Sequence, residues 1–129
     1  MIRKVLLADD EKATLMAVEA TIGNDGAVEI RMANDGDEAI EVARQWKPDL
    51  MFLDVNMPKR NGFEVCRNLK DDASTSSIKI VILTGLASNS SRVKALHEAG
   101  ADDFITKPFG ALELFRKFEE WQGQWGSGE

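Results

Sequence analysis

Short, continuous apolar runs alternate along this chain with stretches whose apolar residues recur every three or four positions, and this alternation strongly constrains the fold. Runs without a polar residue lie at residues 5–8, 50–53 and 80–83, and two weaker runs lie at 28–33 and 104–105. Apolar runs of this length are typical of strands buried on both faces of a parallel sheet. We therefore expect a sheet of five parallel strands.

The stretches between and after these runs have the apolar spacing of amphipathic helices. Because parallel strands are joined by right-handed crossovers, five strands and five helices predict a doubly wound α/β sandwich of three layers. Asp37 and Ser90 are the expected N-caps of two of the helices. The apolar positions of the five expected helices are Leu15, Val18 and Ile22; Ala39, Ile40 and Ala43; Phe63, Cys66 and Leu69; Val93, Leu96 and Ala99; and Leu112, Phe115 and Phe118.

Composition indicates a single domain, expected over residues 1–121, with residues 122–129 as a flexible tail or linker stub. The apolar fraction of 43% in 129 residues is enough to build a core. A net charge of −6 disfavours direct binding to nucleic acid. No apolar run approaches the roughly 20 residues of a membrane helix, so no membrane insertion is expected. The single cysteine, Cys66, cannot form an internal disulfide, which favours a cytoplasmic location.

Chemically useful side chains follow four of the five runs, at the point where each strand is expected to end. Asp9 and Asp10 follow the first run, Asp54 the third, Thr84 the fourth and Lys107 the fifth. The carboxyl ends of parallel strands meet at one edge of the sheet, where open α/β folds bind their ligands. We therefore expect three carboxylates, a hydroxyl and an ammonium group to converge there.

Three neighbouring carboxylates repel one another, so a cation is expected between them. Mg²⁺ is the hard divalent ion that proteins hold with one or two carboxylates. Asp54 then remains available to attack phosphorus and become an aspartyl phosphate, whose charge the ion, Lys107 and Thr84 are suited to stabilise. The second strand is expected at the sheet edge in a 2-1-3-4-5 order, so its terminal Asn34 and Asp35 need no role.

Four segments together resemble the receiver domains of response regulators in two-component signalling. They are LLADDE, MFLDVNMPKRNGFEV, VILTG and GADDFITKPF, in that order along the chain. The resemblance implies a flavodoxin-like fold with sheet order 2-1-3-4-5, Asp54 as the phosphorylated residue, and a cis peptide before Pro108. It also implies Mg²⁺ ligands at Asp9, Asp10, Asp54 and the Asn56 backbone carbonyl, a phosphate-binding lysine at Lys107, and a switch pair of Thr84 and Phe104.

The resemblance also implies partners and a mode of action. Asp54 is expected to receive a phosphoryl group from a sensor histidine kinase or a phosphotransfer protein, and the altered surface to bind an unknown downstream effector. The chain is then a signalling switch and not an enzyme acting on an external substrate. A phosphorylation-dependent homodimer through a charged face that includes Asp102, Glu113 and Arg116 is a further expectation. Phe104 stands where the family often has tyrosine, so it has no hydroxyl for signalling.

Three alternatives remain open from the sequence. A phosphatase with an aspartyl-phosphate intermediate places its nucleophile on the first strand and an acid two residues later. Here the candidate nucleophile, Asp54, ends the third strand, and the residue two positions later is Asn56. A flavin-binding flavodoxin needs a phosphate-binding loop after the first strand, where this chain has the acidic residues 9–11. A receiver-like scaffold that acts without phosphorylation is the third.

Overall fold

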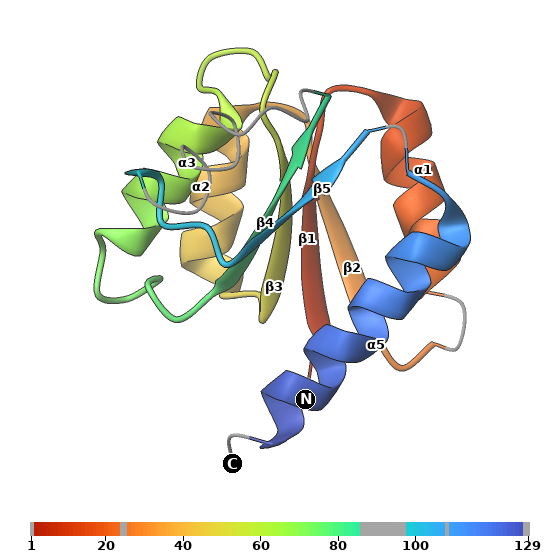
Figure 1. Ribbon diagram of the computed structural model, residues 1–129. Helices are drawn as coiled ribbons and strands as arrows, with labels where there is room; N and C mark the ends of the chain where they lie inside the picture. The colour runs from red at the N-terminus through yellow and green to blue at the C-terminus, as the bar shows by residue number, and fades with distance from the viewer. Residues whose placement is uncertain (1, 24–25, 86–97, 108, 128–129) are drawn as a thin grey trace.

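The computed structural model describes residues 2–23, 26–85, 98–107 and 109–127, and it has the expected architecture (Figure 1). Five parallel strands form one sheet in the order β2-β1-β3-β4-β5, which confirms the predicted doubly wound fold. The expected fourth helix, around residues 93–99, falls largely outside the described residues. The elements are β1 (Lys4–Ala8), α1 (Lys12–Ile22), β2 (Glu29–Ala33), α2 (Gly36–Trp46), β3 (Leu50–Asp54), α3 (Gly62–Lys70), β4 (Lys79–Thr84), β5 (Asp103–Thr106) and α5 (Ala111–Ser127).

The strand register places the carboxyl ends of the central strands side by side. Ala8 of β1 pairs with Leu53 of β3, and Asp54 pairs with Leu83 of β4. Thr84 in turn pairs with Thr106 of β5. Residues that directly follow these strands therefore meet at one edge of the sheet, as the sequence predicts.

Helices cover both faces of the sheet, with α2 and α3 on one side and α1 and α5 on the other (Figure 1). Alternate residues of each strand enter opposite cores because side chains along a strand point to opposite faces. On β3, Met51 and Leu53 pack in the core beneath α2 and α3, whereas Leu50 and Phe52 pack in the core beneath α1 and α5. This two-sided burial explains why the strand is an uninterrupted apolar run.

The start of α2 differs from the sequence prediction. Asp35, not Asp37, is the N-cap, and its side chain accepts a hydrogen bond of 2.8 Å from the Glu38 backbone N–H. The Glu38 carboxylate in turn accepts from the Asn34 N–H at 2.7 Å. An Asp followed three residues later by Glu is the spacing of a capping box, so Asp35 has a structural role where none was expected. The other expected cap, Ser90, lies outside the described residues.

Helix α5 continues through residue 122 to Ser127, past residue 121, after which the sequence predicts a tail or linker stub. Trp121 is buried against Phe52, with 5.6 Å between ring centroids. The Gln122 amide accepts from the Ile2 N–H at 2.8 Å and donates to the Ile2 carbonyl at 3.0 Å. These contacts hold the helix against the sheet beyond the point where the apolar pattern ends. No described helix is long and apolar enough to span a membrane.

Gly62 lets α3 begin against the end of β3, and we expect Gly62→Ala to destabilise the protein by about 2 kcal/mol or more. A Cβ at this position lies 2.4 Å from the Asp54 carbonyl oxygen, which is backbone and cannot rotate away. Urea unfolding measures the loss. Gly123→Ala is the matched control, because a Cβ there meets nothing within 4 Å and alanine favours the helix. Equal stability of the two variants contradicts the close approach.

Candidate functional site

Three carboxylates meet at the carboxyl edge of the sheet. Asp9 and Asp10 follow β1, and Asp54 ends β3. One oxygen of each residue lies within 4.8 Å of those of the other two. The side chains of Asp9 and Asp54 are only 1% and 8% exposed, whereas Asp10 is exposed. The structure therefore brings the predicted acids together, with one open toward solvent.

Lys107 joins two of these acids. Its Nζ lies 2.9 Å from Asp9 Oδ2 and 3.1 Å from Asp54 Oδ1. Its backbone N–H donates to the Thr84 carbonyl at 2.7 Å, which fixes the residue after β5 beside the end of β4. The lysine thus reaches the site from the strand end that the sequence predicts.

Burial and the neighbouring charges shift the pKa values of Asp54 and Lys107. Burial raises the pKa of Asp54 to about 6, the charge of Asp9 adds to the shift, and Lys107 opposes it. For Lys107, burial lowers the pKa, but the hydrogen bonds and charges of Asp9 and Asp54 outweigh burial and raise it. In the protein without a cation, the lysine is therefore held charged while the Asp54 carboxylate is destabilised.

The donor set fits a hard divalent cation. Carboxylate oxygens are the ligands that Mg²⁺ prefers, and the three here are close enough to share one ion. A cation among them offsets the mutual repulsion that contributes to the raised pKa of Asp54.

A pocket of about 460 Å³ opens beside the cluster, and the expected ligand residue Asn56 lines it. Thr84 is buried at the end of β4, next to Gly85, which also lines the pocket. Phe104 is half-buried and packs against the core beneath α2 and α3. The geometry thus places the predicted switch pair on the two strands next to the site. The peptide bond before Pro108 lies outside the described residues.

Glu11 is part of the site although the sequence analysis gave it no role. Its carboxylate lies 3.4 Å from the Lys107 Nζ, and its backbone N–H donates to Asp9 Oδ1 at 2.9 Å. A hydrogen bond from Thr14, followed by the charge of Lys107, lowers the pKa of Glu11. Its position as the third acid in a row after the first strand was the available signal.

In this doubly wound sheet an aspartate ends the third strand, and two acids and a lysine join it from other strand ends. This arrangement defines the class of receiver-type switch domains. The chain belongs to the response regulator receiver domain family, whose model matches residues 5–119. It is accordingly a phosphoryl-accepting switch of two-component signalling, and the phosphatase and flavodoxin alternatives are not favoured.

Known relatives agree with this assignment. The chain is 39% identical over 117 residues to the response regulator PleD of Caulobacter vibrioides, covering 91% of this chain and 25% of PleD. It is 38% identical over 114 residues to the response regulator MprA of Mycobacterium leprae, covering 88% of this chain and 48% of MprA. The chain thus spans between a quarter and a half of the length of these relatives.

Among solved structures, the chemotaxis response regulator CheY4 of Vibrio cholerae is similar to this chain. The TM-score is 0.84 at 28% identity, and the match covers 93% of this chain and 98% of CheY4.

Proposed function

We propose that Asp54 is the phosphorylated residue and that it receives the phosphoryl group from a phosphohistidine of a sensor histidine kinase or phosphotransfer protein. The observation that carries this proposal is the pairing of the nearly buried Asp54 carboxylate with Lys107 at 3.1 Å, beside two further acids. A buried carboxylate with a fixed cation on one side and a pocket on the other is suited to attack phosphorus.

Asp9, Asp10, Asp54 and the Asn56 carbonyl would hold Mg²⁺. When bound, the ion supplies positive charge against the oxygens of the transferring phosphoryl group. Asp10 is the exposed member of the set, so it faces the solvent from which an ion enters.

In the transfer step, an Asp54 oxygen attacks phosphorus and an O–P bond forms. The P–N bond of the phosphohistidine breaks, and its electron pair stays on the imidazole of the donor. Lys107 then pairs with the new phosphoryl oxygens instead of with the Asp54 carboxylate. Its present distance of 3.1 Å from that carboxylate supports this role.

Phosphorylation would act on the chain through Thr84 and Phe104. The Thr84 hydroxyl moves toward the phosphoryl oxygens, and the Phe104 ring fills the space beneath it. The backbone bond from Lys107 to Thr84 supports coupling between β4 and β5. The surface around β5 and α5 then changes its affinity for a downstream effector, and the only chemistry that the chain performs is its own phosphorylation and dephosphorylation.

The remaining proposals concern the domain boundary, the cellular location and the assembly of the protein. We place the receiver domain at residues 1–121 and the protein in the cytoplasm, without direct contact with nucleic acid. A phosphorylation-dependent homodimer through the charged face of β5 and α5 is supported by exposed Glu113 and Arg116. On the same face, Asp102 already pairs with Lys70 at 2.8 Å.

Incubation with acetyl phosphate and Mg²⁺ tests the proposed acceptor. We expect the intact mass to rise by about 80 Da, the mass of one phosphoryl group on an acyl phosphate. The gain should be absent without the metal and absent in Asp54→Ala. Asp37→Ala is the matched control, since Asp37 is an exposed acid on α2, and it should gain the same mass.

Two outcomes contradict the proposal. Mass gain in Asp54→Ala would place the phosphoryl group on another residue. No gain in the wild type, either with acetyl phosphate or with a phosphorylated kinase, would favour the scaffold that acts without phosphorylation.

A further inference from the structure

The β3–α3 loop, residues 55–61, carries an expected cation ligand into the site and is held firmly at its start. Asn56, whose carbonyl is a proposed Mg²⁺ ligand, lines the pocket beside the acids. The Val55 N–H, just before it, donates to a backbone carbonyl of β4 at 3.1 Å. The Met57 side chain, just after it, is buried in the core beneath α2 and α3. The first half of the loop is therefore fixed by the sheet and the core.

The second half of the loop contacts the first residue of α2. The Gly36 N–H donates to the Pro58 carbonyl at 3.2 Å. A Cβ on residue 36 would overlap the backbone carbonyl and the Cβ of Arg60. The φ of Gly36 is not positive, so alanine could adopt the same backbone conformation and would favour the helix. Glycine is therefore needed at this position for the space that it leaves to the loop.

Lys59, between these two contact points, has a strained backbone. Its φ is 70°, in the left-handed region that only glycine adopts readily. Strained residues persist where the surrounding structure holds them, and they are concentrated at functional sites. Lys59 and Arg60 also form ion pairs with two acids of the same helix end, but both basic side chains are exposed, and exposed ion pairs contribute little to stability. The contact with Gly36 is therefore the main support for the strained conformation.

The start of α2 is a rigid support for this contact. The Asp35 side chain caps the helix, and the Glu38 carboxylate accepts a hydrogen bond from the Asn34 N–H. The first turn is therefore fixed to the chain that precedes it. Further along, the helix is buried in the core through Ala39, Ile40 and Ala43. A methyl group added to residue 36 therefore displaces the loop and not the helix.

We propose that Gly36 is a positioning residue for the cation site. On the basis of the proposed function, in which the Asn56 carbonyl is a Mg²⁺ ligand, Gly36 sets the Mg²⁺ affinity by holding the loop that carries this ligand. Mg²⁺ demands a nearly ideal octahedral arrangement of oxygens, so a small displacement of one ligand weakens its binding. Residues that orient metal ligands without touching the metal commonly change the affinity by about ten- to a hundredfold.

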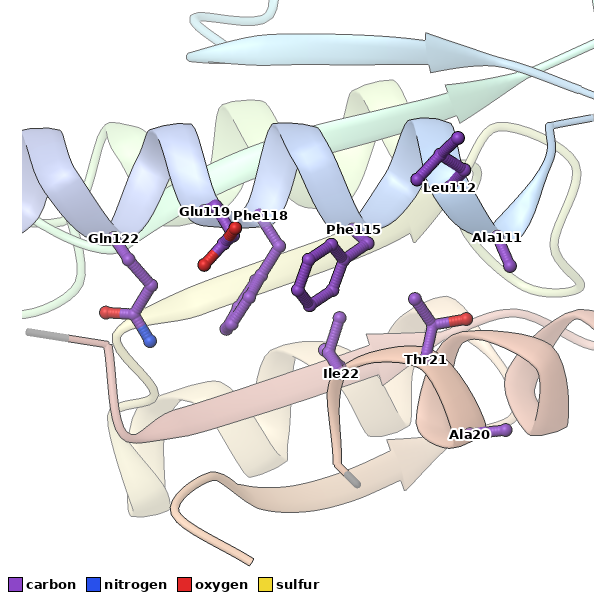
Figure 2. A pocket seen from close by; sticks show the side chains of 9 residues that line it. All are labelled: Ala20, Thr21, Ile22, Ala111, Leu112, Phe115, Phe118, Glu119 and Gln122. Atoms are coloured by element: carbon purple, nitrogen blue, oxygen red, sulfur yellow. The ribbon is translucent and has the colours of Figure 1, made fainter. Parts of the chain in front are cut away.

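Calorimetric titration of the unphosphorylated chain with MgCl₂ tests this role. We expect Gly36→Ala to bind Mg²⁺ more weakly than the wild type by about tenfold or more. Ile22→Ala is the matched control for lost stability. Ile22 is 4% exposed and lines the groove between α1 and α5 (Figure 2), on the face of the sheet away from α2 and α3 (Figure 1). This variant should be less stable but keep a Mg²⁺ affinity within about twofold of the wild type.

A second pair of variants tests the loop without adding a group to α2. Lys59→Gly and Lys59→Val both remove the exposed ammonium group, so they change the charge equally. Glycine adopts a positive φ freely, whereas a β-branched residue strongly disfavours it. We expect Lys59→Gly to bind Mg²⁺ within about twofold of the wild type and Lys59→Val to bind it about fivefold more weakly or worse. Because the Lys59 side chain is 61% exposed, both variants should fold.

Thermal melting in EDTA checks that each variant is folded, and if Gly36→Ala does not fold, the Lys59 pair decides. Wild-type affinity in a folded Gly36→Ala protein overturns the positioning role, as does equal affinity in the two Lys59 variants. An equal loss in Ile22→Ala also overturns it, because lost stability would then explain both results. A wild type that binds no Mg²⁺ is a distinct outcome, since it contradicts the proposed cation site itself and with it the role of Gly36.

Discussion

Replacing Asp54 with asparagine is expected to stabilise the protein without Mg²⁺ by about 2–3 kcal/mol at neutral to mildly alkaline pH. The cause is the pKa of Asp54, which burial and the charge of Asp9 raise from 3.8 to about 6. A raised pKa in the folded state means that folding favours the protonated carboxyl. The stability that this group contributes is therefore complete below about pH 3.8 and is lost as the pH rises through about 6.

Asparagine keeps the size of the side chain and cannot ionise, so it does not suffer that loss. We expect the two proteins to differ little near pH 4 and to diverge up to about pH 7, with the asparagine variant the more stable. Urea unfolding in EDTA across this range measures the difference. Asp37→Asn is the control, because its side chain is 55% exposed, and its difference from the wild type should not grow in the same way.

Urea unfolding in the presence of Mg²⁺ separates two effects of the Asp54 charge on stability, namely the cost of burying it and its contribution to binding the cation. A bound cation stabilises the wild type by offsetting the repulsion among the acids, and we expect a smaller gain in Asp54→Asn, which has lost one charged ligand. An asparagine variant that is less stable than the wild type in EDTA at about pH 8 would mean that the pairing with Lys107 outweighs the cost of burial.

The sheet and the convergence of the site were predictable because both depend on the geometry of parallel strands covered by helices on both faces. A strand covered by helices on both faces needs apolar residues at every position, so β3 is visible as an apolar run. Parallel strands all end at the same edge, so the polar residue after each run marks the site. The positions of Asp9, Asp54 and Lys107 at this edge follow from the strand geometry without any knowledge of distances.

Other features depend on contacts between segments far apart in the sequence. The helical run of α5 past residue 121 depends on Gln122 bonding to Ile2 and on Trp121 packing against β3, and no local pattern announces either contact. Glu11 joins the site because its backbone N–H donates to Asp9 Oδ1 and its carboxylate lies near the Lys107 Nζ. Asp35 is different, since its spacing to Glu38 is a local pattern that can be seen in the sequence and that favours Asp35 over Asp37 as the N-cap.

Trp121→Ala is expected to cost about 3–5 kcal/mol of unfolding free energy, the range for removing a large buried aromatic ring. Trp121 is 2% exposed, and its ring packs against Phe52 at the centre of the sheet. Alanine leaves a cavity between α5 and β3 that neither element can close alone, because each is fixed by its neighbours. Met16→Ala is the control, since Met16 is 62% exposed, and it should change the stability by less than about 1 kcal/mol.

Trp121→Phe divides this cost between packing and hydrogen bonding. Phenylalanine keeps most of the buried ring but removes the indole N–H that donates to Asp103 Oδ2 at 3.0 Å. Asp103 Oδ1 still accepts from the Phe104 backbone N–H at 2.8 Å, so the carboxylate is not left without a partner. We therefore expect a loss of about 1–2 kcal/mol, well below that of alanine. Equal losses in the two variants would assign the anchoring of α5 to the hydrogen bond, and the stability of the helix would then depend on the charge of a residue in β5.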